Sequence, residues 1–90
     1  MSYDTVSVTT SATLIVSASE ARKELKLCNT ANGTIVYLGQ DSSVTTSNGF
    51  PLYENQSVAM ERDWGQWLGD VYGIVGSGTA DIRYWESKGI

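Results

Sequence analysis

The chain has 90 residues, of which six are Lys or Arg, ten are Asp or Glu and none is His, so its net charge at pH 7 is −4. A chain of this length makes one domain, which we place over residues 1–90. Nucleic acid is an unsuitable partner, because binding to phosphates needs a clustered cationic face. The one basic cluster, over residues 22–26, is interleaved with Glu20 and Glu24.

The amino terminus carries no targeting signal. Residues 1–4 lack the cationic region and apolar core of a leader, and no later apolar run approaches the roughly 20 residues that cross a bilayer. The sequence therefore predicts a cytoplasmic chain with no membrane partner. The single cysteine, Cys28, excludes an internal disulfide and fits that reducing compartment.

The residue usage is typical of strands. Eight Val, five Ile and nine Thr stand against six Leu, and β-branched side chains suit a pleated surface. Alternation and turn signals predict strands over residues 5–8, 12–18, 23–30, 34–39, 57–61, 70–75 and 79–86, with a further extended segment from Pro51. No segment has a convincing helical pattern. We predict an all-β fold, a small antiparallel β-sandwich or compact jelly roll of seven to eight short strands.

Strict alternation also assigns the faces of each strand. It puts Leu14 and Val16 on one face of the second strand and Ile15 on the other. The strand over residues 34–39 is apolar on both faces, which is typical of a strand covered on both sides. We expect a partner subunit to supply the second cover, over Val36 and Leu38.

Two short segments predict hairpins. Asn32 and Gly33 both tolerate the positive φ of a type I′ turn, so they are expected to join the strands on either side of them. The glycine pair at 76 and 78 predicts a closing hairpin between residues 70–75 and 79–86. Between these, residues 42–49 form a long polar loop rich in Ser, Thr and Asn.

Nothing in the sequence indicates catalysis. Without His, the commonest general base and transition-metal ligand are both missing, and Cys28 has no Cys-His partner. Carboxylate pairs such as Asp81 with Glu86, or Glu61 with Asp63, have no evident reason to meet around a substrate. We therefore predict no catalytic residue, no cofactor and no metal site.

The aromatic residues are the strongest candidates for binding. Trp64 and Trp67 flank a glycine in a predicted loop, where they either anchor an interface, stack on a sugar or cap the core. Trp85 alternates onto the face of Asp81 and Arg83, away from the core, so something outside the monomer is expected to cover it. The predicted interface residues are Val36, Leu38, Tyr53, Trp64, Trp67 and Trp85.

Two blocks carry a resemblance to a known group. V-Y-L-G-x-D-S-S-V-T-T-S-N-G-x-P-L, over residues 36–52, and S-G-T-A-D-I-R, over residues 77–83, resemble segments of small tailed-bacteriophage virion proteins. The resemblance covers residues 22–86 and implies a small β-sandwich of the capsid decoration or cement type, with no catalytic residue. One departure is the turn after Leu52, where the group often has Pro-Gly-Glu and this chain has Tyr53 to Gln56; Asn55 can still adopt the left-handed conformation.

The resulting expectation is a non-enzymatic virion protein that binds and stabilises the head shell. Its partners would be the major capsid protein or another virion protein, and further copies of itself in a trimer or dimer. It would be found on the outer surface of the head, and in the host cytoplasm during assembly. The alternatives are a tail, neck or fibre-attachment component, and a carbohydrate-binding module that stacks sugars on Trp64, Trp67 and Tyr53.

Overall fold

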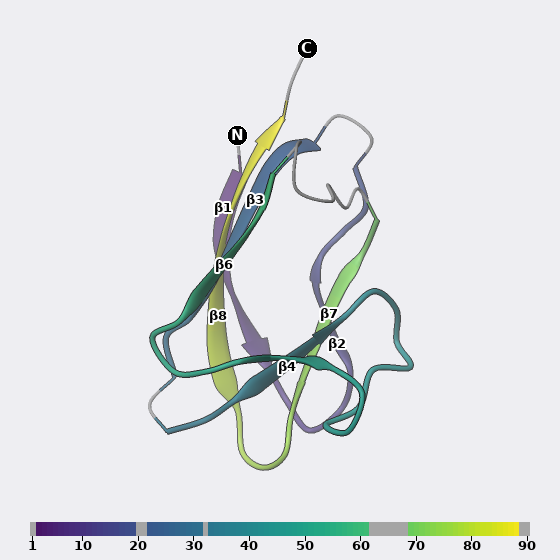
Figure 1. Cartoon of the computed structure of the whole chain (residues 1–90), viewed down its shortest axis with the longest axis vertical. Helices are drawn as coiled ribbons and strands as arrows, with labels where there is room; N and C mark the ends of the chain where they lie inside the picture. Colours follow the sequence, from purple (N-terminus) through teal and green to yellow (C-terminus); the bar gives the residue numbers. More distant parts are fainter. Residues whose placement is uncertain (1, 20–21, 32, 62–68, 89–90) are drawn as a thin grey trace.

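The computed structural model describes residues 2–19, 22–31, 33–61 and 69–88, which form eight β-strands (Figure 1). The strands are β1 (Ser2–Val8), β2 (Thr13–Val16), β3 (Arg22–Asn29), β4 (Val36–Gly39), β5 (Phe50–Leu52), β6 (Ser57–Glu61), β7 (Val71–Val75) and β8 (Ala80–Lys88). No helix is present in these ranges. The all-β prediction is confirmed, and every predicted strand appears.

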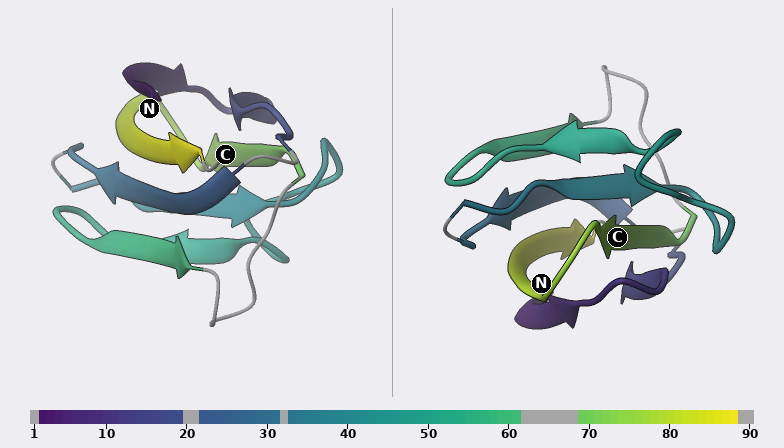
Figure 2. Two further views of the ribbon diagram at one scale, coloured as in Figure 1. Left: turned by 90° about the horizontal axis from the view of Figure 1, so that it is seen from above. Right: turned by 90° about the horizontal axis from the view of Figure 1, so that it is seen from below.

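The strands divide into two four-stranded sheets in which all neighbours are antiparallel. Sheet A has the order β1-β8-β3-β6 and sheet B the order β2-β7-β4-β5. Seen along the strands, the sheets are two facing layers, as in a β-sandwich (Figure 2). A single apolar core lies between the sheets, made of Val8, Ile15, Val16, Leu25, Leu27, Val36, Leu38, Leu52, Val71, Val75, Ala80 and Ile82.

Alternation predicts the faces of β3 and β8 correctly. Leu25 and Leu27 are buried, whereas Glu24 and Lys26 between and beside them are exposed. In β8 the even-numbered side chains from Ala80 to Glu86 turn inward, and Asp81, Arg83 and Trp85 between them turn out. These strands lie at the centre of sheet A, and the period of two holds from Glu24 onward, after a register shift between Arg22 and Glu24.

Alternation fails in β2 because the strand contains a bulge. Leu14 pairs with Tyr72 and Val16 pairs with Val71, which are adjacent residues of β7. Ile15 is therefore an extra residue in β2. As a result Ile15 and Val16 are both buried and Leu14 is exposed, which corrects the prediction that Leu14 and Val16 share a face.

Both predicted hairpins are wrong. The connections β3–β4 and β7–β8 pass from one sheet to the other, since β3 and β8 pair within sheet A while β4 and β7 pair within sheet B. Gly33 and Gly78 have the positive φ values that turn residues favour, 76° and 70°, but each turn leads into an arch between layers. Asn32 lies outside the described residues.

Buried Asn29 explains why the chain crosses after β3. Its Nδ2 donates to the carbonyls of Thr34 at 2.8 Å and Leu52 at 2.9 Å, and its Oδ1 accepts from the Ala31 N–H at 2.9 Å. One side chain thereby satisfies three backbone groups where sheet A meets sheet B. These hydrogen bonds of Asn29 override the preference of Asn32 and Gly33 for a tight hairpin turn.

The second cover of β4 comes from the chain's own β4–β5 loop, over residues 40–49. Gly39 points outward from sheet B, and a Cβ built on it would lie 2.5 Å from the Cβ of Val44. Val44 is buried there, outside the main core, and a Cβ on Gly49 would lie 2.6 Å from the Cβ of Tyr37. The loop therefore packs directly on the outer face of sheet B.

The burial of Val36 and Leu38 between the two sheets corrects the prediction for these residues. Both side chains point into the sandwich core and are almost completely buried, at 0% and 6% exposure. They have no surface left for a partner, so they are core residues and not interface residues. The mistake arose because this strand is apolar on both faces, and the sequence does not say which face turns toward the core.

The loop is held by its own polar side chains. The Asn48 Oδ1 accepts from the Thr45 N–H at 2.7 Å, and the Gly49 N–H donates to the Thr45 carbonyl at 2.9 Å. The Asp41 carboxylate accepts from both the hydroxyl and the N–H of Ser43, which lowers the pKa of Asp41 below its ordinary value of 3.8. The dense hydroxyls and amides of this segment thus serve to build an ordered loop.

Candidate binding face

The outer face of sheet A brings exposed aromatic and basic side chains together. Register aligns Tyr3 and Thr5 of β1 and Arg83 and Trp85 of β8 with Lys26 and Cys28 of β3, and these residues lie on the outer side of the sheet. Two adjacent rows of outward side chains result: Tyr3, Trp85 and Lys26, then Thr5, Arg83 and Cys28. We refer to Tyr3, Lys26, Cys28, Arg83 and Trp85 as the aromatic-basic face.

Tyr3 and Trp85 form an exposed aromatic pair. Their ring centroids are 6.2 Å apart with an angle of 30° between the planes, within the range of favourable aromatic contacts. The two residues remain 76% and 51% exposed, respectively. The strand β1 begins three residues earlier than the sequence predicted, and this extension brings Tyr3 beside Trp85.

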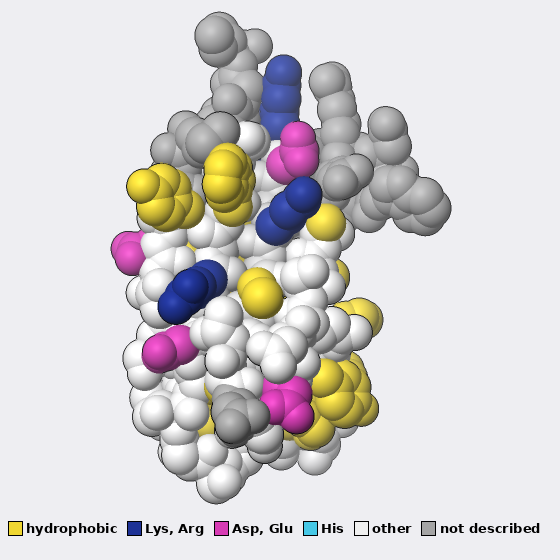
Figure 3. All heavy atoms as spheres, turned by 90° about the vertical axis from the view of Figure 1, so that its left-hand side faces the viewer, with side chains coloured by type: hydrophobic (Ala, Val, Ile, Leu, Met, Phe, Trp, Pro, Cys, Tyr) yellow, Lys and Arg dark blue, Asp and Glu magenta, His cyan; other side chains and the backbone are white. Residues whose placement is uncertain are grey.

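The two basic side chains of this face are available to a ligand. Lys26 lies opposite Trp85 in register, and Arg83 is two residues from Trp85 along β8, roughly 7 Å away. Neither side chain makes an ion pair or hydrogen bond within the described ranges. Figure 3 shows basic and hydrophobic side chains sharing this side of the molecule. Acidic side chains also lie on this side of the molecule (Figure 3), so the two cations stand on a face of mixed charge.

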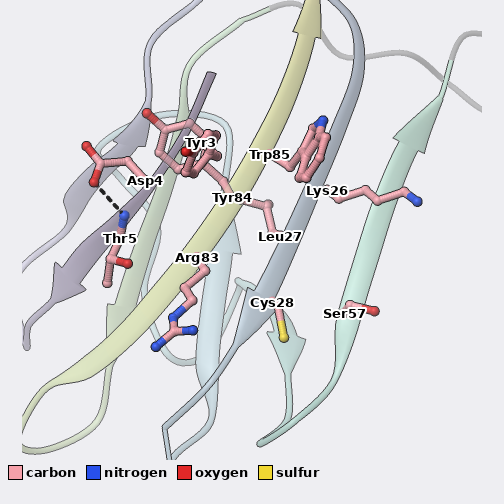
Figure 4. Close-up of a pocket in the computed structure, with 10 residues that line it drawn as sticks. All are labelled: Tyr3, Asp4, Thr5, Lys26, Leu27, Cys28, Ser57, Arg83, Tyr84 and Trp85. Carbon is pink, nitrogen blue, oxygen red and sulfur yellow. Dashed lines mark hydrogen bonds between the residues drawn. The ribbon is translucent and has the colours of Figure 1, made fainter. Parts of the chain in front are cut away.

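A shallow hollow of about 570 Å³ lies between these side chains. Its lining includes the aromatic pair and the two basic side chains of this face. The other lining residues are Asp4, Thr5, Leu27, Cys28, Ser57 and Tyr84. In Figure 4, Lys26 extends toward β6 and Arg83 extends away from it, so the cations flank the hollow on different sides.

The lining combines apolar surface with a few charged and polar groups. Asp4 is its one carboxylate, and its Oδ1 accepts from the Thr5 N–H at 2.7 Å. Cys28 is a free thiol, half-buried in β3. The lining therefore offers a ligand apolar contacts, two cations and one carboxylate.

Asp81 and Glu86, a carboxylate pair not expected from the sequence to meet, lie on opposite sides of β8. Asp81 is exposed on the outer side of β8, whereas Glu86 is buried on the inner side and bonded to Arg22. Arg22, which the sequence suggested was part of a surface cluster, is 2% exposed. The other pair, Glu61 with Asp63, involves a residue outside the described ranges.

The remaining predicted interface residues lie in different places. Trp85 is on the aromatic-basic face, as its alternation predicts. Tyr53 follows β5 in sheet B and is 54% exposed, in a turn where Asn55 adopts the expected left-handed conformation with φ of 58°. Trp64 and Trp67 lie outside the described residues. The contacts of Trp85 and Tyr53 with a partner stay predictions.

Sequence reasoning missed Tyr3, Lys26 and Arg83 as candidate site residues. The signal for Arg83 was present, since it shares the outward face of β8 with Trp85. Tyr3 and Lys26 join them only through the pairing of β1 and β3 with β8, which are distant in sequence.

Two searches of the described residues were negative. They contain no helix with the length and hydropathy needed to cross a membrane. They also contain no group of three or more His, Cys, Asp or Glu side chains arranged to hold a metal ion.

Comparisons with protein-family models, with curated proteins and with solved structures found no match to this chain. The likeness to small phage virion proteins therefore depends on the two sequence blocks over residues 36–52 and 77–83. In the structure the first block forms β4, the loop that packs on it, and β5. The second leads into β8, the strand that carries Arg83 and Trp85.

Proposed function

We propose that this chain is a non-enzymatic virion structural protein of the capsid decoration type, which attaches to the outer surface of a phage head through sheet A. The observation that carries the proposal is the exposed aromatic pair Tyr3 and Trp85 on a flat sheet face. Exposed aromatic clusters flanked by polar groups are typical of protein-binding surfaces.

The sequence blocks supply the biological context of the proposal. The blocks resemble segments of virion proteins. A small β-sandwich with an ordered β4–β5 loop also suits attachment to a larger shell. A decoration protein acts by mass action, because anything that binds the assembled lattice and not its free subunits stabilises the lattice. At a concentration 100 times its dissociation constant this amounts to about 2.7 kcal/mol per site.

The test uses heads of the phage that encodes the chain, prepared without this protein. Adding the purified chain back is expected to raise the temperature at which heads release DNA, and the chain should cosediment with heads. Binding to tails alone would overturn the head assignment and favour a tail, neck or fibre-attachment role. If the purified chain binds a glycan and does not bind heads, the carbohydrate-binding alternative is favoured.

A matched pair of variants locates the contact. Trp85→Ala is expected to weaken head binding about thirtyfold, since loss of an interface anchor typically costs roughly 2 kcal/mol. Phe50→Ala removes an exposed aromatic ring from sheet B, 63% exposed, and should bind as the unmodified chain does. Equal effects of the two substitutions would contradict attachment through sheet A.

Self-association is part of the proposal and is measured separately. We expect a trimer or dimer on the head surface, with Tyr53 as a candidate contact between copies. Light scattering of the free chain and image reconstruction of decorated heads report on this. If both measurements show a monomer, self-association is removed from the proposal, and the proposal of head binding is unchanged.

A further inference from the structure

We propose that the hollow of the aromatic-basic face binds an acidic, extended segment of a partner protein, with one apolar side chain of that segment seated against Trp85. The inference rests on the proposed function, because it names the chemistry of the surface that this sheet would contact. Apolar packing, charge and spacing each support it independently.

The apolar part follows from the lining. Trp85 and Tyr3 form one end of the hollow, and Leu27, Cys28 and Tyr84 lie among the residues beyond them. A partner side chain placed there covers aromatic surface that the monomer leaves in water. Aromatic and large aliphatic residues gain most from such burial.

The charge requirement follows from the order of residues along the two central strands. On the outward side of β3, Glu24 precedes Lys26, and on the outward side of β8, Asp81 precedes Arg83. The two cations line the hollow and these two anions lie one row beyond them, while Asp4, the one carboxylate of the lining, already accepts a hydrogen bond from the Thr5 N–H. An acidic segment is attracted when centred on the hollow and repelled when displaced, so the charges also select its position.

The spacing favours an extended segment. Side chains at alternate positions of a strand point to the same side and lie roughly 7 Å apart. An apolar residue with an acidic residue two positions before it and another two positions after it therefore presents three side chains to the sheet together. The apolar one enters the hollow and the carboxylates reach outward on either side, toward Lys26 and Arg83.

A second copy of this chain fits the face poorly. A twofold contact of the face with itself would oppose Lys26 and Arg83 to the same cations of the other copy. Like charges facing each other across an interface oppose association. This argues for a partner of different sequence.

The test uses the intact chain and four blocked peptides of five residues. The designed peptide is acetyl-Glu-Thr-Phe-Thr-Glu-amide; the controls replace both Glu by Gln, replace Phe by Ala, or move the acids next to the Phe. Binding is followed by NMR through the indole N–H of Trp85 and the backbone amides of Lys26, Cys28 and Arg83. We expect the designed peptide to bind at least about threefold more tightly than each control. A difference of this size is typical of weakly screened surface ion pairs.

Ionic strength and variants test the charge requirement. Raising the salt concentration from about 0.01 M to about 1 M shortens the Debye length from about 30 Å to about 3 Å, and should remove the advantage of the Glu peptide over the Gln peptide. Arg83→Glu is expected to weaken binding of the Glu peptide at least threefold. Lys23→Glu makes the same charge change at an exposed position outside the hollow and should leave binding unchanged.

Four results would overturn the inference: equal binding of the Glu and Gln peptides, equal losses in Arg83→Glu and Lys23→Glu, shifts at Trp85 that depend on protein concentration without peptide and so indicate a second copy, or equal protection of heads by the chain and its Arg83→Glu variant. The outcome is separate from that of the proposed function. If the chain and its Arg83→Glu variant protect heads equally, the inference fails and the function stands. If the Glu peptide binds as expected but heads are not bound, the function fails and the inference stands.

Discussion

The Arg22 Nε donates to the Oε2 of Glu86 at 2.6 Å, and both side chains are almost fully buried. The same guanidinium donates to the carbonyls of Ser17 at 2.6 Å and Gly69 at 3.1 Å, which flank β2 and β7. Arg22 and Glu86 belong to adjacent strands of sheet A, so this one arginine ties sheet A to the backbone segments that enter and leave sheet B.

Replacement of Arg22 alone should destabilise the fold strongly. Arg22→Met leaves the Glu86 carboxylate buried without its cation, and breaking a buried pair on one side typically costs about 3–5 kcal/mol. The double variant Arg22→Met with Glu86→Leu removes both charges and is expected to recover much of this loss. Urea unfolding measures both. A double variant no more stable than the single one would show that the hydrogen bonds to Ser17 and Gly69 dominate.

Asn29 should be intolerant of an acidic replacement. In Asn29→Asp the carboxylate faces the carbonyls of Thr34 and Leu52 with no proton to donate, so we expect a loss of about 3 kcal/mol or more in the free energy of unfolding. Asn55→Asp is the matched control, because Asp also tolerates the left-handed conformation at that exposed turn. The control is expected to change stability by about 0.5 kcal/mol or less. Comparable losses in both would contradict the role of the buried amide.

Gly39→Ala should displace the β4–β5 loop. The added Cβ would lie 2.5 Å from the Cβ of Val44, an overlap that forces the loop away from sheet B and typically costs about 1–3 kcal/mol. Gly76→Ala is the control, since the nearest atom to its Cβ is the Thr46 methyl at 4.0 Å. Thermal unfolding and the amide shifts of the loop report the difference. An unperturbed loop in Gly39→Ala would refute the direct contact of Val44 with β4.

The Asp41 contact should weaken in acid. Because hydrogen bonds from Ser43 lower the pKa of Asp41, the contact contributes to stability above the ordinary value of 3.8 and is lost as the pH falls through the lowered pKa. An NMR titration of the Asp41 carboxyl measures this directly. In Ser43→Ala the hydroxyl donor is gone and the backbone N–H remains, so the pKa of Asp41 is expected to rise part of the way toward 3.8. No change in that variant would exclude the hydroxyl as the main cause.

The local pattern of the sequence determined the fold class and much of the secondary structure. β-branched residues in short alternating runs predict strands, and each of the eight strands of the structure overlaps a predicted segment, although several ends differ, as at the start of β1. Alternation also placed Leu25 and Leu27 inside and Trp85 outside, and the preference of Asn for positive φ predicted the turn at Asn55. Each of these depends on a residue and its near neighbours, so the sequence contains the information directly.

Tertiary packing alone decided the partners of each strand. A turn dipeptide such as Asn32-Gly33 favours a bend but does not say which sheet the chain enters next, and buried Asn29 sets that choice through carbonyls distant in sequence. The bulge at Ile15, the burial of Arg22 and the covering of Gly39 by Val44 depend in the same way on contacts between separate segments. The meeting of Tyr3, Trp85, Lys26 and Arg83 has the same origin, because β1, β8 and β3 become neighbours only through long-range pairing.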